Sequence, residues 1–385
     1  MNKPFAAAVR KASGRMSIML FLALVCLCAG LGAETLNTEV KNHFSSEAIF
    51  YGDSALPTAE AGITWKPELY SGYSPLPGLR LAGELSMDSR LRLVFDSDNS
   101  SQSMDASLYR AWLAASTVNT ELKAGLQHIR MGVAQIYRPL QWFDQIRPDD
   151  PRAETEGVQA LTLRHFFPNP ELRIWLLPSA DRLKGNEVLP SKADEWEFGG
   201  RLAWRNPLGE SGFSYHQRMV AEPFSGNGIK EYRAAFDQRV DGFMGGWLES
   251  SLSVLDHGIG TSFLLFSTPE KLRLATTLGC DYTLGIGNGV YLLLEQYLQY
   301  EAAELGRLSN SQLHTALLMS YPLGLLDSMQ LLGMYDLRED RLLGSLSWRR
   351  SYDLLSLELT LNLDSGYPAW QTQTPALHLR VNYDI

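Results

Sequence analysis

The chain has 385 residues, a formal net charge of −9, 20% charged residues and 45% hydrophobic residues, a hydrophobic fraction too high for a disordered chain. This length can form two soluble domains or one large barrel. The acidic balance argues against nucleic acid as a partner, because a nucleic-acid-binding surface has to be basic.

The N-terminus has the pattern of a secretory signal peptide. Four basic residues come first: Lys3, Arg10, Lys11 and Arg15. An uncharged, mostly apolar run over 16–33 follows and ends in small residues. We expect residues 1–33 to be a signal peptide that is removed on export. The alternative is an uncleaved membrane anchor, since the run approaches the length of a spanning helix.

Removal of residues 1–33 leaves 30 basic residues against 43 acidic ones, a formal charge of −13. It also leaves Cys280 as the only cysteine. We therefore expect no disulfide and no cysteine metal site within one chain.

The last ten residues, 376–385, alternate apolar and polar side chains. Successive side chains of a strand point to opposite faces, so this segment is predicted to be a strand with one apolar and one polar face. Such a strand fits a half-buried sheet in a soluble protein. It also fits the closing strand of an outer-membrane barrel, whose apolar face contacts lipid and whose polar face lines the lumen. Its pairing partner would lie near Ser46 or Leu79.

Strand number and spacing favour the barrel. Segments of about ten residues with this pattern cover nearly the whole chain from Leu79 onward. No later segment resembles a transmembrane helix, and strands cross lipid only as a closed barrel. We predict an all-β fold, a single transmembrane antiparallel β-barrel of about 16 strands over residues 79–385. About 18 strands is the second choice, in which 44–71 add a hairpin; otherwise 34–78 form an N-terminal segment inside or below the barrel.

Short turns alternate with longer connections when the strands are counted back from the last one. The short turns lie at Asn119, Asn169, Pro207, Asp241, Gly285, Pro322 and Arg350. The longer segments are 96–105, 133–155, 179–194, 221–228, 256–270, 301–310 and 364–375, with 338–341 as a short exception. Bacterial barrels place short turns on the periplasmic side and long loops outside, so this order predicts an outer position for 133–155.

The segment 133–155 combines aromatic residues with closely spaced charges of both signs. A loop folded into the lumen would bury the aromatic residues against the wall and present the charges to a channel, where rings of charge set selectivity. The alternative is a surface loop packed by Arg–Asp pairs and prolines. The candidate pore-lining or constriction residues are Arg130, Arg138, Asp144, Arg147, Asp149, Asp150 and Arg152.

The sequence carries no motif of a known catalytic or nucleotide-binding site. The glycines of 285–289 lack the G-x-G-x-x-G spacing, and Asn288–Gly289 favours a hairpin turn. The motifs G-x-S-x-G and H-E-x-x-H do not occur, and the seven histidines are scattered. We expect no enzyme, no catalytic residue, no cofactor and no metal site.

Several blocks resemble a signature of uncharacterised, porin-like outer-membrane barrels of Gram-negative bacteria. The more specific blocks are Leu126 to Gly132, Arg138 to Asp144, Asp149 to Pro151 and Glu156 to Val158. The less specific ones are Cys280 to Thr283 with the glycines that follow, Ser320 to Asp327 and Trp348 to Asp353. The resemblance implies an outer-membrane location and a porin-like barrel, without a substrate or catalytic residues. Ile385 departs from the terminal aromatic residue usual in such barrels.

These observations support three hypotheses of function. The first is an outer-membrane, porin-like channel for small polar solutes, whose acidic balance favours cations or neutral solutes. The second is a non-conducting structural or ligand-binding barrel, plugged by 34–78 and the inward loop. The third is a membrane-embedded hydrolase. The expected partners are outer-membrane lipid and the barrel-insertion machinery, which would engage the C-terminal strand; the oligomeric state does not follow from the sequence.

Overall fold

The structure is a computed structural model. It describes residues 36–52, 58–96, 100–144, 157–180, 182–221, 228–256, 272–302, 310–364 and 375–385. The predicted signal peptide, 1–33, lies outside these residues. Within them, no helix is long and apolar enough to cross a membrane.

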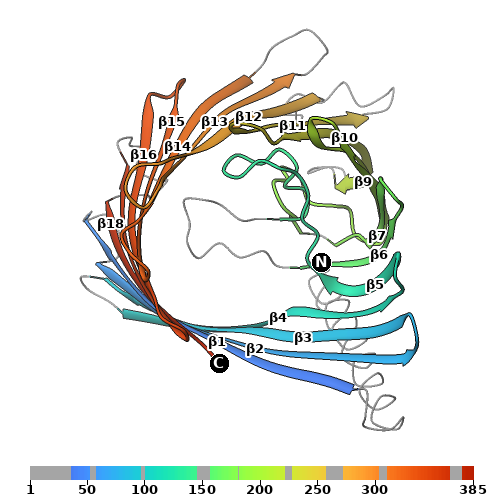
Figure 1. The fold of residues 1–385 in the computed structure, drawn as a ribbon, viewed down its shortest axis with the longest axis horizontal. Helices are drawn as coiled ribbons and strands as arrows, with labels where there is room; N and C mark the ends of the chain where they lie inside the picture. Colours follow the sequence, from blue (N-terminus) through green and yellow to red (C-terminus); the bar gives the residue numbers. More distant parts are fainter. Residues whose placement is uncertain are drawn as a thin grey trace.

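The described residues form one antiparallel sheet of eighteen strands that closes on itself (Figure 1). The first half contains β1 (Leu36–Tyr51), β2 (Ala59–Leu76), β3 (Leu79–Phe95), β4 (Ser100–Ser116), β5 (Thr120–Gln127), β6 (Val158–Phe166), β7 (Glu171–Pro178), β8 (Trp196–Asn206) and β9 (Gly209–Ala221). The second half contains β10 (Gly228–Val240), β11 (Gly245–Asp256), β12 (Leu272–Leu284), β13 (Val290–Ala302), β14 (Asn310–Pro322), β15 (Asp327–Asp336), β16 (Arg341–Ser351), β17 (Leu355–Asp364) and β18 (Ala376–Asp384). Each strand pairs with its sequence neighbours, and β1 also pairs with β18, which closes the barrel.

The first choice of about sixteen strands is wrong, and the second choice of eighteen is confirmed. The two additional strands are β1 and β2, so residues 36–51 and 59–76 belong to the wall and do not lie inside or below the barrel. The partner of the last strand is β1, in which Ser46 lies opposite Val381. The pattern of β1 is ambiguous in the sequence. Its outer face combines Phe44 and Phe50 with the small residues Ser46 and Ala48, which weakens the alternation of apolar and polar side chains.

The two faces of the wall differ in polarity as the alternation predicts. On β18, the outward Leu377 and Leu379 are 40% and 42% exposed, whereas the inward His378 is 4% exposed. Large apolar side chains are exposed in the same way on strands around the whole barrel, including Leu161 on β6 and Phe236 on β10. A continuous apolar outer surface over a polar interior suits contact with lipid.

The two rims of the barrel carry different connections. At one rim every connection is two to five residues long, from 77–78 between β2 and β3 to 285–289 between β12 and β13. The other rim carries all the longer ones, including 128–157 and 179–195. The predicted loop 96–105 is shorter than expected, at 96–99. Strand β4 already begins at Ser100, where its first residues are polar and exposed on both faces, so the sequence shows no alternation there.

Candidate functional site: two loops inside the barrel

The first part of the connection between β5 and β6, residues 128–144, folds into the lumen (Figure 1). Strand β5 ends at Gln127, and residues 128–144 then run inside the ring toward β11, β12 and β13 without forming a helix or strand. Backbone N–H groups of such an irregular segment have no ladder partners and must find acceptors elsewhere. Two glutamates of the wall supply most of them.

Glu249 on β11 accepts three of these N–H groups. Val133 and Ala134 donate to Oε2 at 2.7 and 2.8 Å, and Leu140 donates to Oε1 at 2.7 Å. The glutamate is completely buried. A carboxylate only accepts hydrogen bonds, so it matches a loop that presents only donors.

Glu295 on β13 accepts the next three. Gln135 donates to Oε1 at 2.7 Å, and Ile136 and Tyr137 donate to Oε2 at 3.0 and 2.8 Å. The indole N–H of Trp247 donates to Oε1 at 2.9 Å. We call Glu249 and Glu295 the carboxylate clamp. Between them, Thr277 on β12 donates its hydroxyl to the carbonyl of Tyr137 at 2.7 Å.

Gly132 lets the loop approach the clamp closely. Its φ of +86° lies in the left-handed region, and a Cβ there would lie 2.2 Å from Oε2 of Glu249. Any side chain at this position would therefore strain the backbone and displace the carboxylate.

Apolar side chains attach the same loop to the wall. Trp142 and Phe143 are buried in a cluster with Trp175 and Leu177 of β7, and Phe143 meets Trp175 edge-on at 5.7 Å between ring centroids. A second cluster packs Ile136 and other loop residues against β11, β13, β14 and β15. The expectation that an inward loop buries its aromatic residues against the wall is confirmed.

Two of the seven candidate residues pair with each other. Arg138 Nη1 lies 2.5 Å from Asp144 Oδ2, and Nη2 donates to the carbonyl of Met131 at 3.2 Å. Their side chains are only 3% and 2% exposed, so the pair braces the loop from within and does not present its charges to the lumen. Arg130 is exposed and keeps its candidate role. The other four, Arg147, Asp149, Asp150 and Arg152, lie outside the described residues, and their roles stay predictions.

A second loop lies between β7 and β8, and its residues 182–195 also fold inward (Figure 1). Lys184 Nζ lies 2.6 Å from Glu197 Oε1 of β8 and donates to the Ser191 hydroxyl at 2.7 Å. The N–H of Asn186 donates to the carbonyl of Gln141 at 2.7 Å, which joins this loop to the first. The sequence predicts 179–194 only as one of the longer outer connections, because the buried partners of its charges come from distant strands of the fold.

Charged side chains of the inner face are paired across strands, either between neighbours or over one intervening strand. Arg201 on β8 makes two hydrogen bonds to Asp237 on β10, at 2.5 and 2.8 Å. Arg92 on β3 pairs with Glu60 on β2; the arginine is 50% exposed and the glutamate 8%. Each such pair makes the inner wall polar but contributes little net charge to it. Among the described residues, no group of three or more His, Cys, Asp or Glu side chains is placed to hold a metal ion.

Known structures share this architecture. The fold is similar to OccAB1 of Acinetobacter baumannii, with a TM-score of 0.58 and 11% identity over 91% of this chain and 96% of that one. It is also similar to OccK3 (OpdO) of Pseudomonas aeruginosa, with a TM-score of 0.57 and 12% identity over 91% and 96% of the two chains. OccK7 (OpdD) of the same species gives 0.50 and 13% over 91% and 99%.

These structural similarities concern the fold alone, and the predicted single antiparallel β-barrel is confirmed. No protein-family model matches the sequence, and a search of curated proteins finds no match.

Weakening the clamp should widen the lumen. Glu295→Gln keeps the side-chain size but replaces a charged acceptor of four hydrogen bonds, each worth about 1.5–3 kcal/mol. We expect larger and noisier single-channel currents in planar bilayers. Glu358→Gln, on the inner face of β17, is the matched control and should conduct as the unaltered protein does. Identical currents from both variants would show that the clamp does not hold the loop.

Gly132→Ala should mimic loss of the clamp. The strained φ and the contact with Glu249 should lower stability by about 1–3 kcal/mol. We expect easier proteolysis of the loop and a lower temperature at which the folded band is lost on gels run without boiling. Gly333→Ala is the control, because a Cβ at Gly333 of β15 meets no atom within 4 Å. Equal effects of both substitutions would contradict this role of Gly132.

Proposed function

We propose that the protein is an outer-membrane, porin-like channel for small polar solutes, narrowed by the two infolded loops. The observation that carries the proposal is the carboxylate clamp, which fastens residues 133–140 to one side of the lumen. A loop held against one wall narrows a lumen, whereas a plug has to fill it. Within 34–78, the plug suggested by the sequence, residues 36–51 and 59–76 are the wall strands β1 and β2.

Location and assembly are part of the same proposal. The apolar outer surface and the predicted signal peptide over 1–33 support export and insertion into the outer membrane. Strand β18 would be the segment recognised by the barrel-insertion machinery. Its outward Leu377, Leu379 and Tyr383 offer the apolar face that such recognition and lipid contact need.

The pairing of lumenal charges supports weak ion selectivity. The chain is acidic overall, which by itself favours cations. Inside the barrel, however, carboxylates such as Asp237 and Glu60 are buried beneath arginine partners. A solute therefore meets ion pairs more than isolated charges, and this suits polar solutes of either sign or none.

Purified protein should form discrete channels in planar bilayers. Under a KCl gradient we expect a cation-to-anion permeability ratio within roughly threefold of one, because paired charges largely cancel. Arg92→Gln removes an exposed positive charge and retains Glu60, so it should shift the ratio toward cations. Ser89→Ala, which leaves the charge of the same strand unchanged, is the control.

An electrically silent bilayer would overturn the channel proposal, provided the protein is folded. Folding is checked by gel mobility in outer-membrane fractions, since a folded barrel migrates differently from the boiled chain. A strongly cation-selective wild-type channel would instead overturn only the argument from paired charges.

A further inference from the structure

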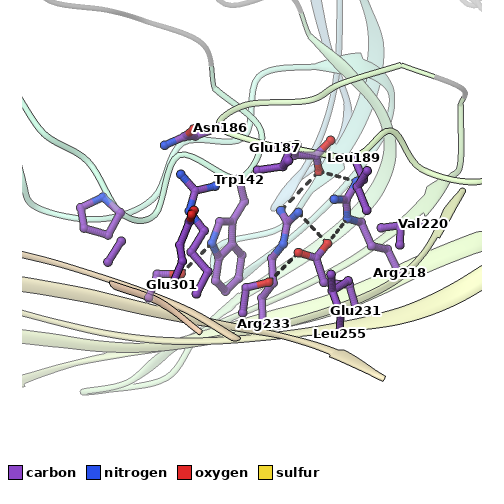
Figure 2. A pocket seen from close by; sticks show the side chains of 16 residues that line it. Trp142, Asn186, Glu187, Leu189, Arg218, Val220, Glu231, Arg233, Leu255 and Glu301 are labelled. Carbon is purple, nitrogen blue, oxygen red and sulfur yellow. Dashed lines mark hydrogen bonds and ion pairs between the residues drawn. The ribbon is translucent and has the colours of Figure 1, made fainter. Parts of the chain in front are cut away.

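A cavity of about 390 Å³ lies between the two infolded loops and the wall of β9 to β13 (Figure 2). The first loop contributes Pro139 and Trp142, and the second contributes residues 186–189. Its volume falls in the range of small-molecule sites. Because its wall residues lie toward the strand ends that meet the long connections, it lies on the long-loop side of the barrel.

Four charged side chains on one side of the cavity form ion pairs with one another. Glu187 of the second loop lies 3.0 Å from Arg218 on β9 and 3.3 Å from Arg233 on β10. Glu231 on β10 pairs with both arginines, at 2.8 Å from Arg233 (Figure 2). All four side chains are at most 10% exposed. This quartet has no net charge and closes one side of the cavity.

The second ion pair, Arg273 on β12 with Glu301 on β13, is looser. Arg273 Nε lies 3.5 Å from Glu301 Oε1, beyond the pairs of the quartet, and the two side chains are 23% and 21% exposed. Nε of Arg273 is buried and has no hydrogen-bond partner within the described residues. Gln299 accepts from Arg273 Nη2 at 2.7 Å and donates to Glu301 at 3.0 Å, which fixes both ends of the pair. In Figure 2, Glu301 lies on the other side of Trp142 from the quartet.

The remaining lining is mostly apolar. Val188 and Leu189 come from the second loop, and Leu255 and Ala275 come from β11 and β12. The cavity thus offers one accessible cation, one accessible carboxylate beside it, and aliphatic side chains. A ligand that fits has to match all three.

We propose that this cavity binds a small zwitterion with an apolar side chain, of the neutral α-amino acid class. Its carboxylate would bind Arg273 and its ammonium group would bind Glu301. Its side chain would extend past Trp142 toward Leu189 and Leu255, which lie on the quartet's side of the indole (Figure 2). Insertion of a zwitterion replaces one loose ion pair by two and leaves the cavity neutral. A simple anion would compete with Glu301 for Arg273, and a simple cation would compete with Arg273 for Glu301, whereas a zwitterion supplies a counter-charge to both.

Three probes that share the leucine side chain separate these cases: L-leucine, N-acetyl-L-leucine, which lacks the ammonium charge, and L-leucinamide, which lacks the carboxylate. Binding is measured by titration calorimetry on the folded barrel in detergent. We expect L-leucine to bind, and each analogue to bind at least about tenfold more weakly, because each loses a charge-assisted contact. Stronger binding of N-acetyl-L-leucine or of L-leucinamide would overturn the proposal in favour of an anion or a cation site. Absence of binding by all three would overturn it outright.

Variants locate the site. Arg273→Gln and Glu301→Gln should each weaken L-leucine binding about tenfold or more. Arg349→Gln, on β16 away from the cavity, should not. If L-leucine binds all variants equally, the ligand lies elsewhere and the assignment fails. Leu255→Ala, which keeps every charge, should weaken binding of L-leucine while leaving glycine binding unchanged, and it serves as the second test if a charge variant does not fold.

This inference rests on the proposed channel function in one respect: the bound zwitterion is taken to be a solute that the channel transports. Binding in detergent is independent of conduction. If the protein conducts but binds no L-leucine, the binding-site proposal fails and the channel proposal stands. If the protein does not conduct but binds L-leucine through Arg273 and Glu301, the channel proposal fails and the binding-site proposal stands.

Discussion

The shape of the lumen depends on six backbone N–H groups that converge on two buried carboxylates. Residues 133–140 have no strand to pair with, yet they lie where bulk water is largely displaced by the wall and by packed side chains. Each unsatisfied amide there would cost about 1–3 kcal/mol of folding free energy. Glu249 and Glu295 accept the hydrogen bonds of these amides, and the converging N–H dipoles offset part of the cost of burying the two carboxyl groups.

The sheet register explains why this contact can form at all. Glu249 lies directly opposite Thr277, and Glu295 lies opposite Gly279, so the three groups that hold the loop stand at neighbouring positions on β11, β12 and β13. The indole of Trp247 lies over Gly279, where a Cβ would come within 2.2 Å of it, and from there it donates to Glu295. The register of the wall strands therefore determines where the first loop lies. The hydrogen bond from Asn186 to Gln141 then positions the second loop against the first.

The fold could be predicted from the sequence wherever lipid and lumen impose opposite polarities on alternate residues. This holds for β17 and β18, and it fails for β1, whose outer face includes Ser46 and Ala48. The inward loop was one of two sequence alternatives, suggested by Trp142 and Phe143 among charges. The clamp could not be predicted, because a glutamate facing the lumen looks like any other inward polar residue. Only the fold brings Glu249 beside Val133, 116 positions earlier in the chain.

The same limit applies to charge. The formal net charge counts every ionisable residue of the chain, whereas a solute in the lumen interacts only with the charges that are accessible on the inner face of the barrel. Here the sheet matches acidic and basic residues across strands, as Arg201 and Asp237 show, and one partner of a pair is often buried beneath the other. Selectivity then comes from the pairs that remain loose and reachable. Arg273 and Glu301 form such a pair, held at the ends by Gln299 and bordered by aliphatic side chains, and its geometry favours a solute that carries both charges itself.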